Sequence, residues 1–289
     1  MNASARPTPL RPHVTLLEAF CRQAHQYLLQ GPAQHEGRLA AMRFLQTQGF
    51  DMAELDRLPL GLFADCATMR QGLLDAGFSS AEIEASDLLA DRRLNGRLVG
   101  PIRAADGQII SLWARHPLGK RPQYLFKGEW KEQVPAFGID VARSALCGGE
   151  ASLVLVEGLF DVLLIQSRGF LPIAAIGGPA TQLTRKRWQH LARLGVRRVI
   201  LALRSDDIGR SGAIVAQKNA AHAQTAPDVS VLPPERLEGL LTPGEFVRLK
   251  GVDAFRALFD APDHAVGTSQ LGAPTREDLA SSDNGPTEQ

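Results

Sequence analysis

The sequence predicts an α/β fold in which a parallel sheet carries helices on both faces and follows a helical and β-containing amino half. Between residues 151 and 235, short apolar runs alternate with stretches of helical pattern. The first run, residues 153–156, stops abruptly at Glu157 and Gly158. Strands buried on both faces give such continuous apolar runs, and strands that alternate with helices form parallel sheets.

The amino half is expected to be helical first and to contain strands later. Residues 16–30 and 37–50 place apolar residues at helical spacing, and residues 63–89 add shorter helices that begin at a serine cap, Ser79 or Ser80. Further along, Asp106 and Gly107 separate two apolar stretches. A dipeptide of this kind is a strong hairpin signal.

The carboxyl half continues the alternation of strands and helices. After the strand at 153–156, the expected elements are a helix from Asp161 to about Arg168, a strand within 169–178, a helix over 183–194, a strand within 196–203, a helix reaching about Ala223 and a strand within 229–233. The strand within 196–203 runs into Asp206 and Asp207, which precede a glycine and the next helix. The carboxyl ends of parallel strands share one edge of the sheet, so this spacing brings acids together there.

Glu157 and Asp161 are the first candidates for chemistry. Glu157 is expected at the carboxyl end of a central strand, Gly158 permits a sharp turn, and Asp161 falls in the first helical turn, where a carboxylate is favourable. Two acids at one sheet edge are suited to a divalent cation. The alternative is that Glu157 is an ordinary loop acid and Asp161 an ordinary helix-capping residue.

Several ordered motifs resemble a known family. The residues VEGLFD, AAIGG and DIGRSGA resemble the TOPRIM domain, the metal-binding unit of bacterial replicative primases, topoisomerases and some nucleases. Residues 96–142 resemble the basic half of the DnaG-type primase core, and residues 232–259 resemble the segment that closes it. The likeness covers roughly residues 40 to 260.

This resemblance implies metal-dependent nucleotidyl transfer, with Mg²⁺ or Mn²⁺ as cofactor and nucleoside triphosphates joined on a single-stranded DNA template. Single-stranded DNA or RNA is the expected nucleic-acid partner. The catalytic residues it implies are Glu157, Asp161 and Asp206, with Asp207 as a further metal ligand and Gly158, Gly177 and Gly209 as turn residues. The residues it implies for nucleic acid or nucleotide are Arg97, Arg115, Tyr124, Lys127, Lys131 and Arg210. A helicase or another complex member is the expected protein partner.

The chain departs from the family at three acidic positions. Arg204 stands at the first place of the Asp-x-Asp pair, and Thr242 and Gly244 replace the two carboxylates on either side of Pro243. An arginine there repels a metal ion by roughly 4 kcal/mol at about 4 Å, for an effective dielectric near 20. It is also able to pair with Asp206 or Glu157 and replace the ion structurally. A weakened or absent metal-dependent activity is therefore expected.

The basic residues are clustered in two segments, although the protein as a whole is almost neutral. The net charge is only +1, yet residues 92–131 contain nine Lys or Arg against two acids, and a second basic cluster covers residues 185–198. Arginine and lysine in such clusters suit phosphate groups, although solvated surface charge is the alternative for both. The three cysteines, Cys21, Cys66 and Cys147, are too widely spaced for the zinc ribbon of bacterial primases.

The expected organisation follows from these patterns: residues 1–12 disordered, 13–95 helical, 96–150 a basic primase-core-like subdomain, 151–235 the TOPRIM domain, 236–266 closing helices and 267–289 a disordered acidic tail. No apolar leader or membrane span is apparent, so a cytoplasmic location is expected. Three functions stay open: a primase-like protein of a replication module or mobile element, a degenerate nucleic-acid- or nucleotide-binding adaptor, and a TOPRIM nuclease.

Overall fold

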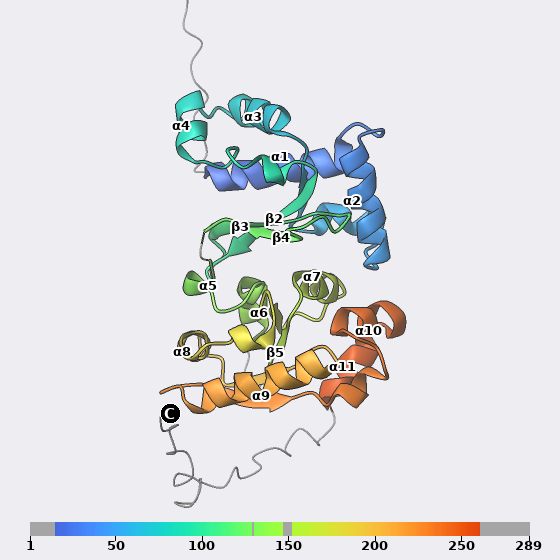
Figure 1. The fold of residues 1–289 in the computed structure, drawn as a ribbon, viewed down its shortest axis with the longest axis vertical. Helices are drawn as coiled ribbons and strands as arrows, with labels where there is room; N and C mark the ends of the chain where they lie inside the picture. Colours follow the sequence, from blue (N-terminus) through green and yellow to red (C-terminus); the bar gives the residue numbers. More distant parts are fainter. Residues whose placement is uncertain (1–14, 129, 147–151, 261–289) are drawn as a thin grey trace, which may run out of the picture.

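The computed structural model describes residues 15–128, 130–146 and 152–260. These residues form two sheets that follow one another along the long axis of the molecule (Figure 1). One is antiparallel, with strand order β1-β2-β3-β4, and the other is parallel, with strand order β6-β5-β7-β8. The predicted fold class is confirmed. The expectations for residues 1–12 and 267–289 and for Cys147 lie outside the described residues.

The amino half packs helices on the antiparallel sheet. Its elements are α1 (Leu16–Gln30), α2 (Glu36–Thr47), η1 (Met52–Arg57), β1 (Gly61–Phe63), α3 (Cys66–Asp75), α4 (Ser80–Ala85), η2 (Arg92–Leu94), β2 (Arg97–Arg103), β3 (Ile109–Arg115) and β4 (Tyr124–Phe126). Gly61 allows α1 to lie directly on β1, because a Cβ there would come within 2.3 Å of the backbone of Ala24. Ser79 forms the predicted cap, and its capping box with Glu82 starts α4.

The carboxyl half contains the parallel sheet. Its elements are α5 (Trp130–Gln133), α6 (Ile139–Leu146), β5 (Leu153–Val156), α7 (Leu159–Ser167), β6 (Ile173–Ala175), η3 (Ala180–Gln182), α8 (Arg185–Arg193), β7 (Arg198–Leu201), α9 (Asp207–Ala221), β8 (Asp228–Val231), η4 (Pro234–Leu237), α10 (Pro243–Lys250) and α11 (Val252–Asp260). Every residue of β5 is buried, and β5 lies between β6 and β7. The predicted central strand before Glu157 is therefore present.

Aromatic packing joins the two halves. Trp113 of β3 is fully buried, and its ring lies edge-on to Phe160 of α7, with ring centroids 5.4 Å apart. Phe137 also contacts Trp113. In Figure 1, α7 lies between the two sheets. This packing fixes the antiparallel sheet against the first helix of the parallel half, and so against the residues that follow β5.

The closing segment returns to the same region. Helix α10 packs against α7 and α11, and Phe246 of α10 is buried beside Phe255 of α11. Thr242 caps α10 by accepting a hydrogen bond from the backbone N–H of Glu245. The N-terminal turn of α10 thereby reaches α7. Within the described residues, no helix is both long enough and apolar enough to span a membrane.

Candidate functional site

Glu157 lies immediately after β5 at the carboxyl edge of the parallel sheet. Its backbone carbonyl accepts hydrogen bonds from the N–H groups of Gly177 and Gly178, at 3.2 and 3.3 Å, which ties it to the loop after β6. Its side chain is half-buried. Burial raises the pKa of Glu157, partly offset by backbone hydrogen bonds from Arg204 and Ala180.

Asp161, in the first turn of α7, points its carboxyl group at the N-terminal turn of α10. The hydroxyl of Thr242 donates to its Oδ1 at 3.4 Å, and a Cβ at Gly244 would lie only 2.1 Å from the same oxygen. Any side chain at position 244 would therefore displace this carboxyl group. Burial raises the pKa of Asp161 to about 7, with Thr242 lowering it and two nearby glutamates raising it further.

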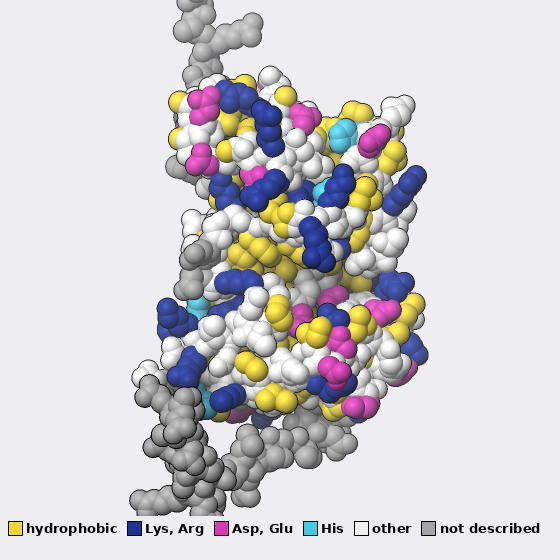
Figure 2. All heavy atoms as spheres, viewed as in Figure 1, with side chains coloured by type: hydrophobic (Ala, Val, Ile, Leu, Met, Phe, Trp, Pro, Cys, Tyr) yellow, Lys and Arg dark blue, Asp and Glu magenta, His cyan; other side chains and the backbone are white. Residues whose placement is uncertain are grey.

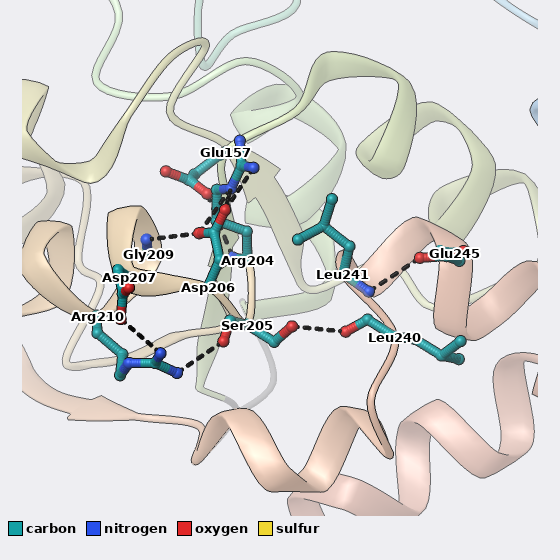
Figure 3. Close-up of polar contacts among 10 residues, drawn as sticks. All are labelled: Glu157, Arg204, Ser205, Asp206, Asp207, Gly209, Arg210, Leu240, Leu241 and Glu245. Carbon is teal, nitrogen blue, oxygen red and sulfur yellow. Dashed lines mark hydrogen bonds and ion pairs between the residues drawn. The ribbon is translucent and has the colours of Figure 1, made fainter.

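Arg204 is paired with Asp206, the acid that remains of the Asp-x-Asp pair. Its Nε–H donates to both carboxylate oxygens of Asp206 at 2.8 Å, and its backbone N–H donates to Oε2 of Glu157 at 3.2 Å (Figure 3). Asp206 also caps α9 by accepting the N–H of Gly209 at 3.1 Å. Hydrogen bonding from Arg204 is the main cause that lowers the pKa of Asp206. The guanidinium of Arg204 is thus paired with the carboxylate that a metal ion would need as a ligand.

Asp207 does not join the other acids. Its side chain is 93% exposed and forms an ion pair with Arg210 at 2.6 Å, on the first turns of α9. Arg210 also donates to the backbone carbonyl of Ser205 (Figure 3). Nowhere in the described ranges do three His, Cys, Asp or Glu side chains come close enough to hold an ion. With Asp206 held by Arg204 and Asp161 directed at α10, the residues present do not fit the metal arrangement that the resemblance implies.

Three glycines shape this edge by close approach. A Cβ at Gly158 would lie 2.9 Å from a carboxylate oxygen of Asp161, and one at Gly209 would lie 1.9 Å from the carbonyl of Arg204. Gly177 has φ +75°, and a Cβ there would meet the indole of Trp130 at 2.7 Å. Each predicted turn glycine therefore lies where a side chain would not fit without a shift in its neighbours.

A cavity of about 440 Å³ opens where this edge meets β4 of the antiparallel sheet. Glu157, Asp161 and Arg204 line it on one side, and Tyr124 and Phe126 line it on the other. The two rings stack nearly parallel, with centroids 6.1 Å apart and an interplanar angle of 11°. The structure thus brings Tyr124 together with the predicted acids.

Arg115, at the end of β3, is enclosed by aromatic rings. Its guanidinium carbon lies 3.9 Å from the ring centroid of Phe44, 5.4 Å from that of Phe160 and 5.6 Å from that of Tyr124. Its Nε and Nη1 are buried and have no hydrogen-bond partner among the described residues. Cation–π contacts take the place of those bonds. Burial is also the main cause that raises the pKa of Tyr124.

The other predicted basic contacts are tied to carbonyl groups. Arg97 is only 3% exposed and donates to the carbonyls of Arg93 and Gln123. Lys127 donates to the carbonyl of Ser86 at 3.1 Å. Lys131 donates to the carbonyl of Gly177 at 2.9 Å and to the side chain of Gln182, and burial lowers its pKa to about 8. Lys127 and Lys131 keep exposed atoms, whereas Arg97 does not face solvent.

The second basic cluster separates into buried and exposed residues. Arg187 is 4% exposed and donates to the carbonyls of Pro135 and Ile176, so it holds the chain together rather than facing a ligand. Arg197 and Arg198 are exposed at the opposite edge of the parallel sheet, where β7 begins. The cluster predicted from sequence is therefore not one continuous surface.

Sequence reasoning did not single out the apolar wall of the cavity. Phe126 and Ile208 both line it, and Ile208 is 56% exposed on the first turn of α9. Phe126 follows Tyr124 by two positions on a strand, so both rings face the same way. That period-two spacing was a usable signal. The contribution of Ile208 depends on how α9 approaches β4, which no local pattern reveals.

Solved structures share this arrangement of two sheets. The RNA polymerase domain of Mycobacterium tuberculosis primase DnaG matches with TM-score 0.62 and 25% identity, covering 83% of this chain and 81% of that one. A DNA primase domain from Pseudomonas aeruginosa matches with TM-score 0.64 and 27% identity, covering 84% and 76%. The chain is homologous to the catalytic core of DnaG primases. The matched region covers more than four-fifths of this chain, so the likeness includes both sheets together.

Curated DNA primases support this homology at the level of sequence. The primase of Deinococcus radiodurans is 34% identical over 140 residues, which cover 47% of this chain and 24% of that protein. The primase of Streptomyces coelicolor is 29% identical over 237 residues, covering 74% of this chain and 36% of that protein. The DnaG-like chain thus spans only part of the length of these relatives. No protein-family model matches it.

Proposed function

We propose that this DnaG-like core binds single-stranded nucleic acid without carrying out metal-dependent nucleotidyl transfer. The observation that supports the proposal best is the pairing of Arg204 with both carboxylate oxygens of Asp206. Phosphoryl and nucleotidyl transfer rely on cations that neutralise charge on the reacting oxygens. Arg204 is fixed on an aspartate and so is not directed at a substrate phosphate.

The antiparallel sheet is better suited than the acidic edge to bind a single strand of nucleic acid. Lys120 and Arg121 are exposed in the loop before β4, Lys127 is exposed just after it, and the aromatic pair Tyr124 and Phe126 lies on β4 itself. Figure 2 shows Lys and Arg side chains over the antiparallel half and hydrophobic side chains in the hollow between the halves. Cations that follow a backbone and rings that stack on bases are the usual means of binding single strands.

The direct test measures binding and synthesis separately. Labelled single-stranded DNA is titrated with the protein in EDTA and in Mg²⁺, and fluorescence anisotropy gives the affinity. One DnaG primase catalytic domain of the same fold, 23% identical to this chain, has been solved bound to ssDNA, which makes DNA the natural first probe. Equal affinity in EDTA and Mg²⁺, with no primer made from nucleoside triphosphates in Mg²⁺ or Mn²⁺, is expected. Binding that requires the metal would overturn the proposal.

Primer synthesis is the second candidate, for one specific reason. Glu157 and Asp161 both line the cavity and neither has a cationic side chain as hydrogen-bond partner within the described residues. If synthesis occurs, Glu157→Gln should abolish it and Arg204→Ala should preserve it. Synthesis that survives Glu157→Gln would exclude this site as its source. Cleavage of a labelled strand without added nucleotides would instead indicate nuclease activity.

A further inference from the structure

The cavity between β4 and the edge of the parallel sheet has mostly apolar walls. Besides Tyr124 and Phe126, its lining includes Leu159, Pro179 and Pro243. Ile208 stands at the same cavity with more than half of its side chain exposed, without the packing that a residue of its size usually has. A hydrated ion or a polyphosphate gains little from such walls. A flat, largely apolar group buries area against them.

The polar groups of the cavity point to a hydrogen-bond donor as ligand. Among the described residues that line it, Arg204 is the one cation, and its Nε–H donates to Asp206. The carboxylate of Glu157 accepts the backbone N–H groups of Arg204, through Oε2, and of Ala180, and in Figure 3 its other oxygen points away from Arg204. A carboxylate has lone pairs for several donors. The site therefore offers an acceptor beside an aromatic wall, and the described residues that line it supply no unpaired cation for a phosphate.

We infer that this cavity binds a nucleobase that carries an exocyclic amino group. The base lies against the wall of Tyr124 and Phe126, and its amino group donates to the carboxylate of Glu157, as a glutamate accepts from the amino group of cytosine. This inference rests on the proposed binding of single strands and names the subsite within it. It assigns the base, rather than the triphosphate, to the edge where primases of the same fold carry acids.

The sharpest test compares two pyrimidines of equal size. Oligodeoxycytidine and oligodeoxyuridine of one length are titrated in EDTA, because cytosine carries an amino group where uracil carries a carbonyl oxygen. Tighter binding of the cytidine strand by about tenfold is expected. Glu157→Gln should bring the two affinities to within about twofold of each other, because the neutral amide is a poorer acceptor.

A matched pair of variants on one helix tests the wall. Ile208→Ala removes an exposed apolar side chain that lines the cavity, whereas Ile214→Ala removes one that is 68% exposed on α9 and does not line it. Ile208→Ala should weaken the cytidine strand by about fivefold, roughly 1 kcal/mol. Ile214→Ala should change nothing. A single 2-aminopurine placed in the strand should lose fluorescence on binding, since stacking on rings quenches it.

The outcomes separate this inference from the proposed function. If both strands bind equally in EDTA and Ile208→Ala matches Ile214→Ala, the base subsite is wrong while binding of single strands stands. If neither strand binds, the proposed function fails as well. If Mg²⁺ with a nucleoside triphosphate competes far better than the free nucleoside, and Glu157→Gln removes that advantage, the cavity holds phosphates through a metal ion and the inference is overturned.

Discussion

The acidic edge of the parallel sheet and the basic antiparallel half compensate their charges differently. At the acidic edge, Asp206 is paired with Arg204 and Asp161 is enclosed against the N-terminal turn of α10. In the antiparallel half, Arg115 is held by ring faces and Lys127 by a carbonyl. Rings and carbonyls leave a positive charge uncancelled, whereas an ion pair cancels it. At the acidic edge Arg204 therefore neutralises Asp206, while the cations of the basic half keep their attraction for an anion.

The largest expected effect concerns Asp161. Its pKa is raised from 3.8 to about 7, so the folded carboxyl group keeps a proton that the unfolded chain has released. The stabilisation is present below the unfolded pKa and is lost as the pH rises through about 7. Asp161→Asn should remove this dependence. As the pH rises from about 4 to about 8, the unfolding free energy of the wild type should therefore fall relative to that of the variant, by roughly 4 kcal/mol at most.

Urea unfolding at several pH values measures this difference, with Asp228→Asn, an exposed residue in β8, as the control. Parallel curves for wild type and Asp161→Asn would mean that the carboxyl group is solvated. The acidic edge would then differ less from the basic half than the contacts indicate.

The second effect concerns the basic half. Lys120→Glu combined with Lys127→Glu should weaken single-stranded DNA binding by about a hundredfold and flatten its salt dependence, because both side chains are exposed beside β4. Arg197→Glu combined with Arg198→Glu makes the same change of charge at the far edge of the parallel sheet. Anisotropy titrations over a range of salt concentrations compare them. Equal losses in both double variants would show that net charge, not this surface, governs binding.

The third effect tests the fit of Asp161 against α10. Gly→Ala within a helix normally stabilises a protein by up to about 1 kcal/mol. At position 244 the new Cβ would lie 2.1 Å from Oδ1 of Asp161, so Gly244→Ala should destabilise instead, by about 2 kcal/mol. In the background of Asp161→Ala the same substitution should cost much less. Chemical denaturation of the four proteins gives the coupling energy, and additive effects would contradict the contact.

Sequence patterns were sufficient to predict the elements that carry the site. The apolar run before Glu157 identified the central strand, and the glycines marked the close approaches. The resemblance marked position 242 as one of the replaced acids, but local patterns did not give the contact of Thr242 with Asp161, because the two are 81 residues apart and meet only where α10 returns to α7. The enclosure of Arg115 likewise joins Phe44 and Phe160 from different halves. Local periodicity gives the element and its face, but not which distant element covers it.

The smallest effect belongs to Arg204. Its ion pair with Asp206 is about one-third exposed on both sides, so solvent screens it. Asp206 has a lowered pKa, so the pair stabilises the fold above the unfolded pKa of 3.8 and loses that contribution as the pH falls through the lower folded value. Arg204→Gln should therefore lower Tm slightly near neutral pH and hardly at all in acid, as measured by thermal unfolding at both pH values.

The same variant separates stability from metal binding. Arg204→Gln frees Asp206 but leaves Thr242 and Gly244 in place, so calorimetric titration with Mn²⁺ should show no saturable binding. Restoring acids at all three positions, as Arg204→Asp, Thr242→Asp and Gly244→Asp together, should create it, because an acid at position 244 also forces Asp161 away from α10. Mn²⁺ binding by Arg204→Gln alone would mean that the arginine is the single barrier. A single substitution would then be enough to create a metal site at the acidic edge, and the replaced acids at positions 242 and 244 would not prevent it.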